Sequence, residues 1–170
     1  PRVHIHIDDG RRWLGRHPQA RYDLIVMNTT FHWRANSTNL LSREFLTLAR
    51  EHLEPGGILA FNATGSPDAL YTAAQVFPYA FRWKESNFVY AANHDFRHPD
   101  SEAAARLEEV AERVGISADH PAERWQRLYD ALTSPQWVDA AHEARLAGRP
   151  LEEITDSNML TEFRYGRMVW

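Results

Sequence analysis

The sequence predicts an α/β fold, and three observations support this prediction. Short apolar runs of strand length recur along the first half of the chain. An amphipathic stretch of helical periodicity lies between two of them, which is the pattern of a βαβ crossover in a parallel sheet. Two later runs are separated by only two polar residues, as in an antiparallel hairpin. The five predicted strands lie at about 3–7, 22–27, 58–62, 81–85 and 88–92.

The first elements follow from local periodicity. Residues 3–7 alternate apolar and polar side chains, as a half-buried strand does, and Asp8-Asp9-Gly10 ends this strand. A short helix is predicted at residues 11–16. The nearly continuous apolar run at 22–27 is typical of a buried parallel strand. Apolar residues at three-to-four spacing predict a helix from Leu40 to Leu53, and the alternative is a slightly later start capped by Ser42.

Breaking and capping residues define the later elements. Pro55-Gly56-Gly57 ends the long helix, and glycine tolerates the positive φ that such a turn needs. Ser66 and Pro67 are typical of the first positions of a helix, which runs to about Phe77. After Pro99 the chain is rich in Ala, Glu and Arg, and three helices are predicted at about 101–114, 121–133 and 135–147. The expected units are 1–98, a helical segment at 99–149, and a tail at 150–170 packing back on the sheet.

Composition narrows the classes of protein. The 170 residues suit one domain, and the net charge of −4 argues against a nucleic-acid partner. The sequence has no cysteine, which fits a reducing compartment, and no apolar run near the roughly 20 residues that span a bilayer. His4 and His6 share one strand face, but no third ligand stands at a telling spacing, so no metal site is predicted.

Two segments at the carboxyl ends of predicted strands are candidates for ligand binding, because ligands of open α/β sheets bind there. A carboxylate in Asp8-Asp9-Gly10 can accept hydrogen bonds from an adenine amino group or a ribose. The alternative is a helix cap and turn. The loop from Asn28 to Arg34 gathers aromatic, imidazole, guanidinium and amide groups in seven residues. A structural loop held by Phe31 and Trp33 is the alternative there.

The ordered set of these segments resembles the spermidine synthase family, within the S-adenosylmethionine-dependent methyltransferase fold. The matching segments are Arg2–Leu14, Tyr22–Val26, Glu44–Leu46, Leu53–Leu59 and, near the C-terminus, Asp156–Glu162. The resemblance covers about residues 2–65 and implies an incomplete Rossmann-like sheet. It also implies S-adenosylmethionine or its decarboxylated form as cofactor, held by Asp9, Asp8 and Gly10, and a small-molecule amine as acceptor. The family's Gly-rich cofactor loop precedes Arg2 and is absent from this chain.

The departures from the family pattern concern catalysis. The family has a proton-accepting aspartate directly after the buried strand and a second carboxylate three residues on, where this chain has Asn28 and Phe31. An amide accepts no proton at neutral pH, which costs about 10²–10⁴ in rate. His32 would then be the proton acceptor. The residues lining the acceptor site would be Thr29, Thr30, Trp33 and Arg34.

Three functions follow as expectations. The first is a fragment of an aminopropyl- or methyltransferase that is inactive by itself, and the second is a non-catalytic ligand-sensing or regulatory domain. The third is an interaction module at 100–148 with Trp125, Tyr129, Leu132 and Trp137 on an apolar face. The loop at 28–39 resembles a bacterial subgroup whose members carry such a domain behind membrane-spanning helices. This resemblance implies a cytoplasmic location, as the cytoplasmic domain of a membrane protein. The strand at 3–7, separated from its family neighbours, is expected to pair with 22–27 or with another chain, as in a homodimer.

Overall fold

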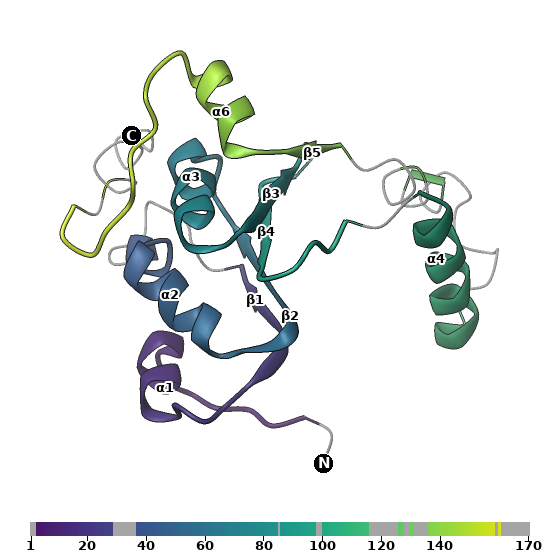
Figure 1. The fold of residues 1–170 in the computed structure, drawn as a ribbon. Helices are drawn as coiled ribbons and strands as arrows, with labels where there is room; N and C mark the ends of the chain where they lie inside the picture. Colours follow the sequence, from purple (N-terminus) through teal and green to yellow (C-terminus); the bar gives the residue numbers. More distant parts are fainter. Residues whose placement is uncertain are drawn as a thin grey trace, which may run out of the picture.

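A five-stranded mixed sheet forms the centre of the protein, in the order β1-β2-β4-β3-β5 (Figure 1). The computed structural model describes residues 3–28, 37–84, 86–97, 100–115, 126–127, 130, 136–158 and 160. The strands β1 and β2 are parallel, and the other neighbouring strands are antiparallel. This architecture is compatible with a Rossmann-like fold and confirms the α/β prediction. The strands are β1 (Tyr22–Met27), β2 (Leu53–Asn62), β3 (Tyr79–Trp83), β4 (Phe88–Ala92) and β5 (Trp137–Val138).

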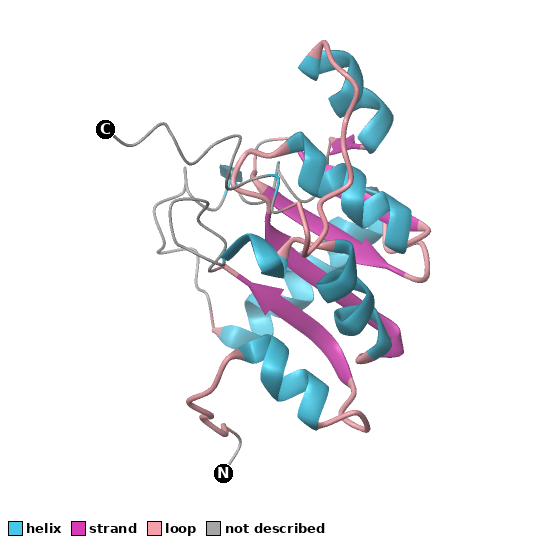
Figure 2. Cartoon of the chain, turned by 90° about the vertical axis from the view of Figure 1, so that its left-hand side faces the viewer, coloured by secondary structure: helices cyan, strands magenta, loops and turns pink. Residues whose placement is uncertain are grey.

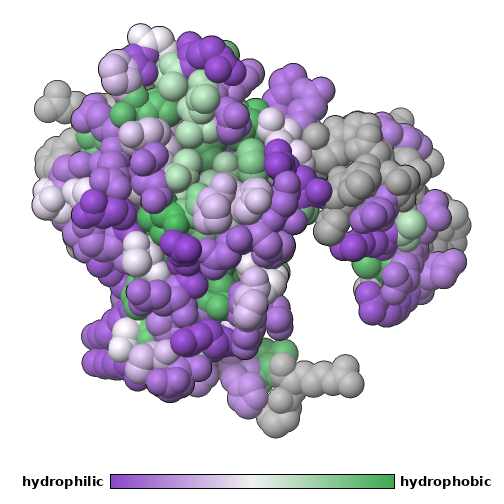
Figure 3. Space-filling model, in the orientation of Figure 1, coloured by the Kyte–Doolittle hydropathy of each residue, from purple (hydrophilic) through white to green (hydrophobic). Residues whose placement is uncertain are grey.

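In the described part of the chain, α1, α2, α3 and α6 lie on one side of the sheet, and α4 stands apart from it (Figures 1 and 2). A short 3-10 turn, η1 (Ser37–Leu40), precedes α2. The helices on the covered side are α1 (Gly10–Arg16), α2 (Arg43–Glu51), α3 (Pro67–Val76) and α6 (Ala140–Ala147), and α4 spans Asp100–Val114. The opposite face of the sheet carries Leu24 and Val26 of β1, which are 56% and 58% exposed. Over most of the surface seen in Figure 3, hydrophilic residues predominate.

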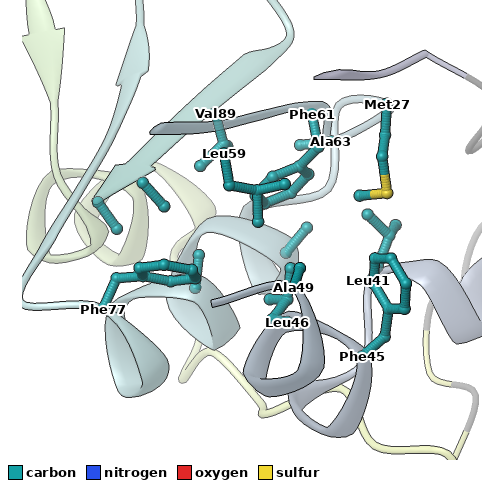
Figure 4. Close-up of a cluster of buried hydrophobic side chains, with 14 of the residues drawn as sticks. Met27, Leu41, Phe45, Leu46, Ala49, Leu59, Phe61, Ala63, Phe77 and Val89 are labelled. Carbon is teal, nitrogen blue, oxygen red and sulfur yellow. The ribbon is translucent and has the colours of Figure 1, made fainter. Parts of the chain in front are cut away.

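The core lies between the sheet and α2 and α3 (Figure 4). Phe61 and Leu59 of β2 are completely buried, as are Leu46 of α2 and Leu70 of α3. A fully buried aliphatic or aromatic side chain stabilises the fold by about 1.5–3 kcal/mol relative to an exposed one. The apolar contacts in this core hold α2 and α3 against the sheet.

Polar side chains define where the helices begin. Asp9 caps α1 by accepting from the Arg12 amide at 2.8 Å, and Ser42 caps α2 by accepting from the Phe45 amide at 3.2 Å. Ser42 was predicted as a cap for a later start, and α2 indeed begins at Arg43. Such caps contribute about 0.5–2 kcal/mol each.

Residues 3–7 do not form the predicted strand. They are extended without a ladder partner among the described residues, and Val3, Ile5 and Ile7 are 73%, 85% and 101% exposed. A strand needs a neighbour for its backbone groups, and this segment stays apart from β1. The prediction that it pairs with 22–27 within this chain is therefore wrong, while pairing with another chain stays a prediction.

Other boundaries shift by a few residues. The predicted strands 22–27 and 88–92 coincide with β1 and β4, which pairs with β3 as a hairpin. The strand predicted at 58–62 begins five residues earlier, and the one at 81–85 is displaced to Tyr79–Trp83. Neither Gly56 nor Gly57 has a positive φ, so the turn argument was wrong there.

The C-terminal half departs further from the helical prediction. Trp137 and Val138, predicted as helix, form β5 and pair with Trp83 and Arg82 of β3. Trp137 packs its ring against Phe81, Tyr90 and Phe96 at centroid distances of 5.6 to 6.4 Å, which accounts for one aromatic residue of the predicted apolar face. Of the helix predicted at 121–133, only residues 126, 127 and 130 are described.

Candidate functional site

A hollow of about 500 Å³ lies between the N-terminal part of the chain and the edge of β1 that has no partner strand among the described residues. Both alternating sets of β1 side chains line it, Leu24 and Val26 from one face and Ile25 and Met27 from the other, so it runs along the strand edge. Apolar walls also come from α1, α2 and η1. The remaining lining residues are His6, Asp8, Asp9, Gly10, Arg11, Trp13, Leu14, Tyr22, Asn28, Leu40 and Phe45.

Asp8 is held by arginines of the following helix. Arg12 pairs with it four residues on, with Nε at 2.9 Å from Oδ1, and Arg16 lies at 3.4 Å from Oδ2. The hydrogen bond from Arg12 lowers the pKa of the Asp8 carboxyl. Asp8 therefore carries a negative charge that is already compensated, and its oxygens face donors of its own chain.

Asp9, unlike Asp8, caps the helix α1. Its Oδ1 accepts the cap hydrogen bond of α1, and Oδ2 accepts no hydrogen bond from the described residues. Asp9 is therefore a helix cap, which was the alternative interpretation of Asp8-Asp9-Gly10. The cap leaves its second carboxylate oxygen able to accept from another donor. Gly10, beside it in the lining, opens α1.

A cluster of aromatic rings lies beside the hollow at α1. Trp13 stacks on His17 with centroids 4.0 Å apart and tilts against His6 at 5.4 Å and Tyr22 at 6.3 Å. Burial raises the pKa of the Tyr22 hydroxyl. Flat apolar surfaces of this kind suit a planar ring as ligand. The sequence analysis did not include Trp13 in the site, although an aromatic residue one helical turn after Asp9 was the available signal.

The carboxyl end of β1 carries Asn28. The Nδ2 of Asn62, at the end of the parallel neighbour β2, donates to Asn28 Oδ1 at 3.0 Å, and Asn62 Oδ1 accepts from the Thr64 amide at 2.9 Å. Thr64 has a φ of +53°, uncommon for a β-branched residue. Two strand ends are thus joined by amide side chains at the hollow's rim, and neither amide group can accept a proton.

One wall of the hollow is fixed by a long-range network around Asp156. Arg11, which lines the hollow, donates to Asp156 Oδ1 at 2.8 Å and to the Asn39 carbonyl at 3.1 Å. Ser42 Oγ donates to the same Oδ1 at 2.6 Å. The Arg11 hydrogen bond lowers the pKa of Asp156, and the carboxylate in turn raises that of Arg11. This network joins α1, η1, α2 and the C-terminal segment, and local sequence patterns gave no sign of it.

The structure brings some of the predicted site residues together. Asp8, Asp9, Gly10 and Asn28 line the same hollow. The other predicted residues lie outside the described part of the chain: Thr29, Thr30, His32, Trp33 and Arg34.

No helix in the described part combines the length and apolarity needed to cross a bilayer.

These features define an α/β domain with a hollow beside β1, an edge strand of the sheet in the described part of the chain. Comparison with curated proteins adds the particular relationship. The chain is 37% identical over 146 residues, 78% of its length, to the polyamine aminopropyltransferase of two Mycobacterium tuberculosis strains and of Mycobacterium bovis. It spans about a quarter of the length of these relatives, 26%. No protein-family model matches. The similarity supports a relationship with the spermidine synthase-like family.

Proposed function

We propose that this chain is the part of an aminopropyltransferase that holds the adenosyl group of decarboxylated S-adenosylmethionine. The observation that carries the proposal is the shared hollow of Asp8–Gly10 and Asn28, in a chain similar to polyamine aminopropyltransferases. The chemistry of the lining fits such a group. Trp13, Ile25 and Met27 offer apolar contact for an adenine ring, and Asp9 Oδ2 offers an acceptor for its amino group or a ribose hydroxyl.

The acceptor of this proposal is a small-molecule amine. When bound, the adenosyl compound supplies the alkyl group to be transferred, and the attacking amine has to lose a proton. Asn28 stands at the strand end but cannot take that proton. His32 would accept it, with Thr29, Thr30, Trp33 and Arg34 around the acceptor. Methyl transfer from S-adenosylmethionine would use the same adenosyl contacts. We expect no transfer by these 170 residues alone.

A second candidate function is ligand sensing without catalysis. The hydrogen bond between Asn62 and Asn28 favours it, because two neutral amides occupy the strand ends nearest the hollow. A domain of this kind would bind the adenosyl compound and pass the bound state to the rest of a larger protein.

Calorimetry of the chain with decarboxylated S-adenosylmethionine, and separately with S-adenosylmethionine, tests the binding step. The informative variant is Asp9→Asn, which keeps the capping oxygen of α1 and removes the charge. We expect it to weaken binding at least tenfold, a change of about 1.4 kcal/mol. The matched control is Asp95→Asn, an exposed carboxylate that does not line the hollow. Equal affinity of the unsubstituted chain and both variants would show that Asp9 does not bind the ligand. If neither ligand gives heat, the proposed binding site is wrong.

Turnover separates the two candidate functions. In the longest form of the protein that is available, Asn28→Asp restores a proton-accepting group at the end of β1. A rise in aminopropyl transfer to a diamine of about 10²-fold or more supports the transferase. Binding without turnover in both forms supports sensing.

A further inference from the structure

The carboxylate of Asp156 joins elements that lie far from it in the chain. Its Oδ1 accepts hydrogen bonds from Arg11 Nη1 of α1 at 2.8 Å and from Ser42 Oγ, the cap of α2, at 2.6 Å. Its Oδ2 accepts from Arg11 Nη2, which makes the arginine pair bidentate. Asp156 lies 145 residues from Arg11 and 114 from Ser42, so a C-terminal segment reaches a site built from the first third of the chain.

The partners of this carboxylate support one wall of the hollow. Arg11 lines the hollow, and its Nη1 also donates to the Asn39 carbonyl of η1 at 3.1 Å. Leu40, the residue after Asn39, lines the hollow as well. Ser42 Oγ accepts from the amide of Phe45 at 3.2 Å, and Phe45 is a further lining residue. Three lining residues from three elements thus depend on one carboxylate.

The segment that carries Asp156, residues 149–156, is here called the strap, and it runs past α3 and α2 (Figure 1). Ile154 is completely buried, its amide donates to Thr72 Oγ1 at 2.8 Å, and its carbonyl accepts from the Arg43 amide at 2.8 Å. Neither Thr72 nor Arg43 lines the hollow. The strap is therefore held by the helical layer at one point and by the wall of the hollow at another.

The ion pair sets the position of Arg11. The side chains of Arg11 and Asp156 are 30% and 38% exposed, so solvent screens their charges only in part. The hydrogen bond from Arg11 holds the pKa of the Asp156 carboxyl below its usual value, so this carboxyl is charged at neutral pH. Without Asp156, the Asn39 carbonyl would be the remaining acceptor for Arg11 among the described residues.

We propose that Asp156 is a positioning residue for the ligand of the hollow, and that docking of the strap and binding of the ligand stabilise each other. The proposal rests on the proposed adenosyl site, because it assigns a control to that site. With the strap docked, Arg11, Leu40 and Phe45 are held where the ligand meets them. With the strap undocked, this wall loses its common anchor and the ligand binds less tightly. Linkage requires the reverse as well, so a bound ligand holds the strap down by the same factor.

The strap gives the bound state a route out of the hollow. Its contacts lead from Arg11 through Asp156 and Ile154 to Thr72 of α3, and the last three of these residues do not line the hollow. A ligand that contacts Arg11 therefore changes the stability of contacts at α3 without touching them. A ligand-sensing domain needs such a link, and a transferase can use it to close its site.

Hydrogen exchange of the unsubstituted chain tests the coupling without any substitution. With saturating decarboxylated S-adenosylmethionine, and separately with S-adenosylmethionine, exchange of the Ile154 amide should slow about tenfold or more. The Phe61 amide, in a strand paired on both sides, reports global unfolding and gives the correction for overall stabilisation. The Arg97 amide, which donates to Asp95 outside the hollow, should exchange at an unchanged rate.

Calorimetry with the same two ligands tests the role of the ion pair. Asp156→Ala and Arg11→Met should each weaken binding about tenfold or more. The double variant should bind no more weakly than the weaker single variant, because both substitutions remove the same pair. Asp95→Ala is the matched control, since it removes a similar ion pair, with Arg97, outside the hollow, and it should bind as the unsubstituted chain does.

The outcomes separate this inference from the proposed function. If neither ligand gives heat with the unsubstituted chain, the adenosyl site is wrong and the coupling falls with it. If the ligand binds but Asp156→Ala keeps full affinity, or the two losses simply add, the coupling is overturned and the adenosyl site stands. The same holds if the ligand slows exchange of the Ile154 amide no more than that of Phe61, and this measurement decides alone should Asp156→Ala fail to fold.

Discussion

Gly57 of β2 lies close to the backbone of β1, and its replacement tests the packing of these two strands. A Cβ at Gly57 would stand 2.7 Å from the Tyr22 carbonyl oxygen and 3.1 Å from both the nitrogen and the oxygen of Glu54. All three atoms are backbone and cannot rotate away. The register of β1 on β2 is irregular at this same point, between Tyr22 and Leu24. Gly57→Ala must therefore separate the two strands at their start.

The expected cost is that of overpacking, about 1–3 kcal/mol in the free energy of unfolding. For a chain of this size that lowers the melting temperature by roughly 2–12 °C, at about 2–4 °C per kcal/mol. The assay is urea and thermal unfolding followed by circular dichroism.

The neighbouring Gly56 supplies the control. A Cβ there meets nothing within 4 Å, and its φ is not positive, so Gly56→Ala should be neutral or slightly stabilising. If the two variants unfold within about 0.5 kcal/mol of each other, the usual scatter of surface substitutions, the close approach of the two strands is refuted.

Three further results are expected. Asp68→Asn should destabilise the fold by about 2–4 kcal/mol in urea unfolding, because the completely buried Asp68 receives two hydrogen bonds from Arg149; a zero coupling energy in a cycle with Arg149→Met would contradict this. Hydrogen bonds from Arg97 lower the pKa of Asp95 to about 2, so its contribution to stability is present above about pH 4 and is lost as the pH falls through 2. In an NMR titration Arg97→Met should return the Asp95 midpoint toward 3.8, and an unchanged midpoint would show that the pair is absent. Phe61→Ala should cost about 3–5 kcal/mol in chemical unfolding, and a loss below 1 would mean that Phe61 is not in the core.

The structure also shows what holds the C-terminal segment against the helices. Residues 149–156 run across α3 and α2: the Glu152 amide donates to Asp68 at 2.9 Å and the Ile154 amide to Thr72 Oγ1 at 2.8 Å. The Ile154 carbonyl accepts from the Arg43 amide at 2.8 Å, and Ile154 is fully buried. The predicted tail packs, in its described part, on the helical layer of the fold.

Elements whose signal lies within a few residues were predicted from the sequence. The apolar run of β1, the hairpin of β3 and β4, and the Ser66-Pro67 start of α3 depend on side-chain periodicity and on local cap chemistry. The position of Asn28 at the end of β1 followed from the same signals, whereas Asp9 follows a segment that is not a strand. That both line one hollow was an expectation from the direction of parallel strands.

Tertiary structure alone decided the rest. Whether residues 3–7 become a strand depends on a partner that local periodicity cannot supply. The contacts of Asp156 with Arg11 and of Arg149 with Asp68 join residues 145 and 81 positions apart in the chain. The closeness of Gly57 to Tyr22 depends on strand register. Sequence patterns report what a residue prefers within a turn or two, whereas pairing, register and burial are set by which distant segments fold against each other.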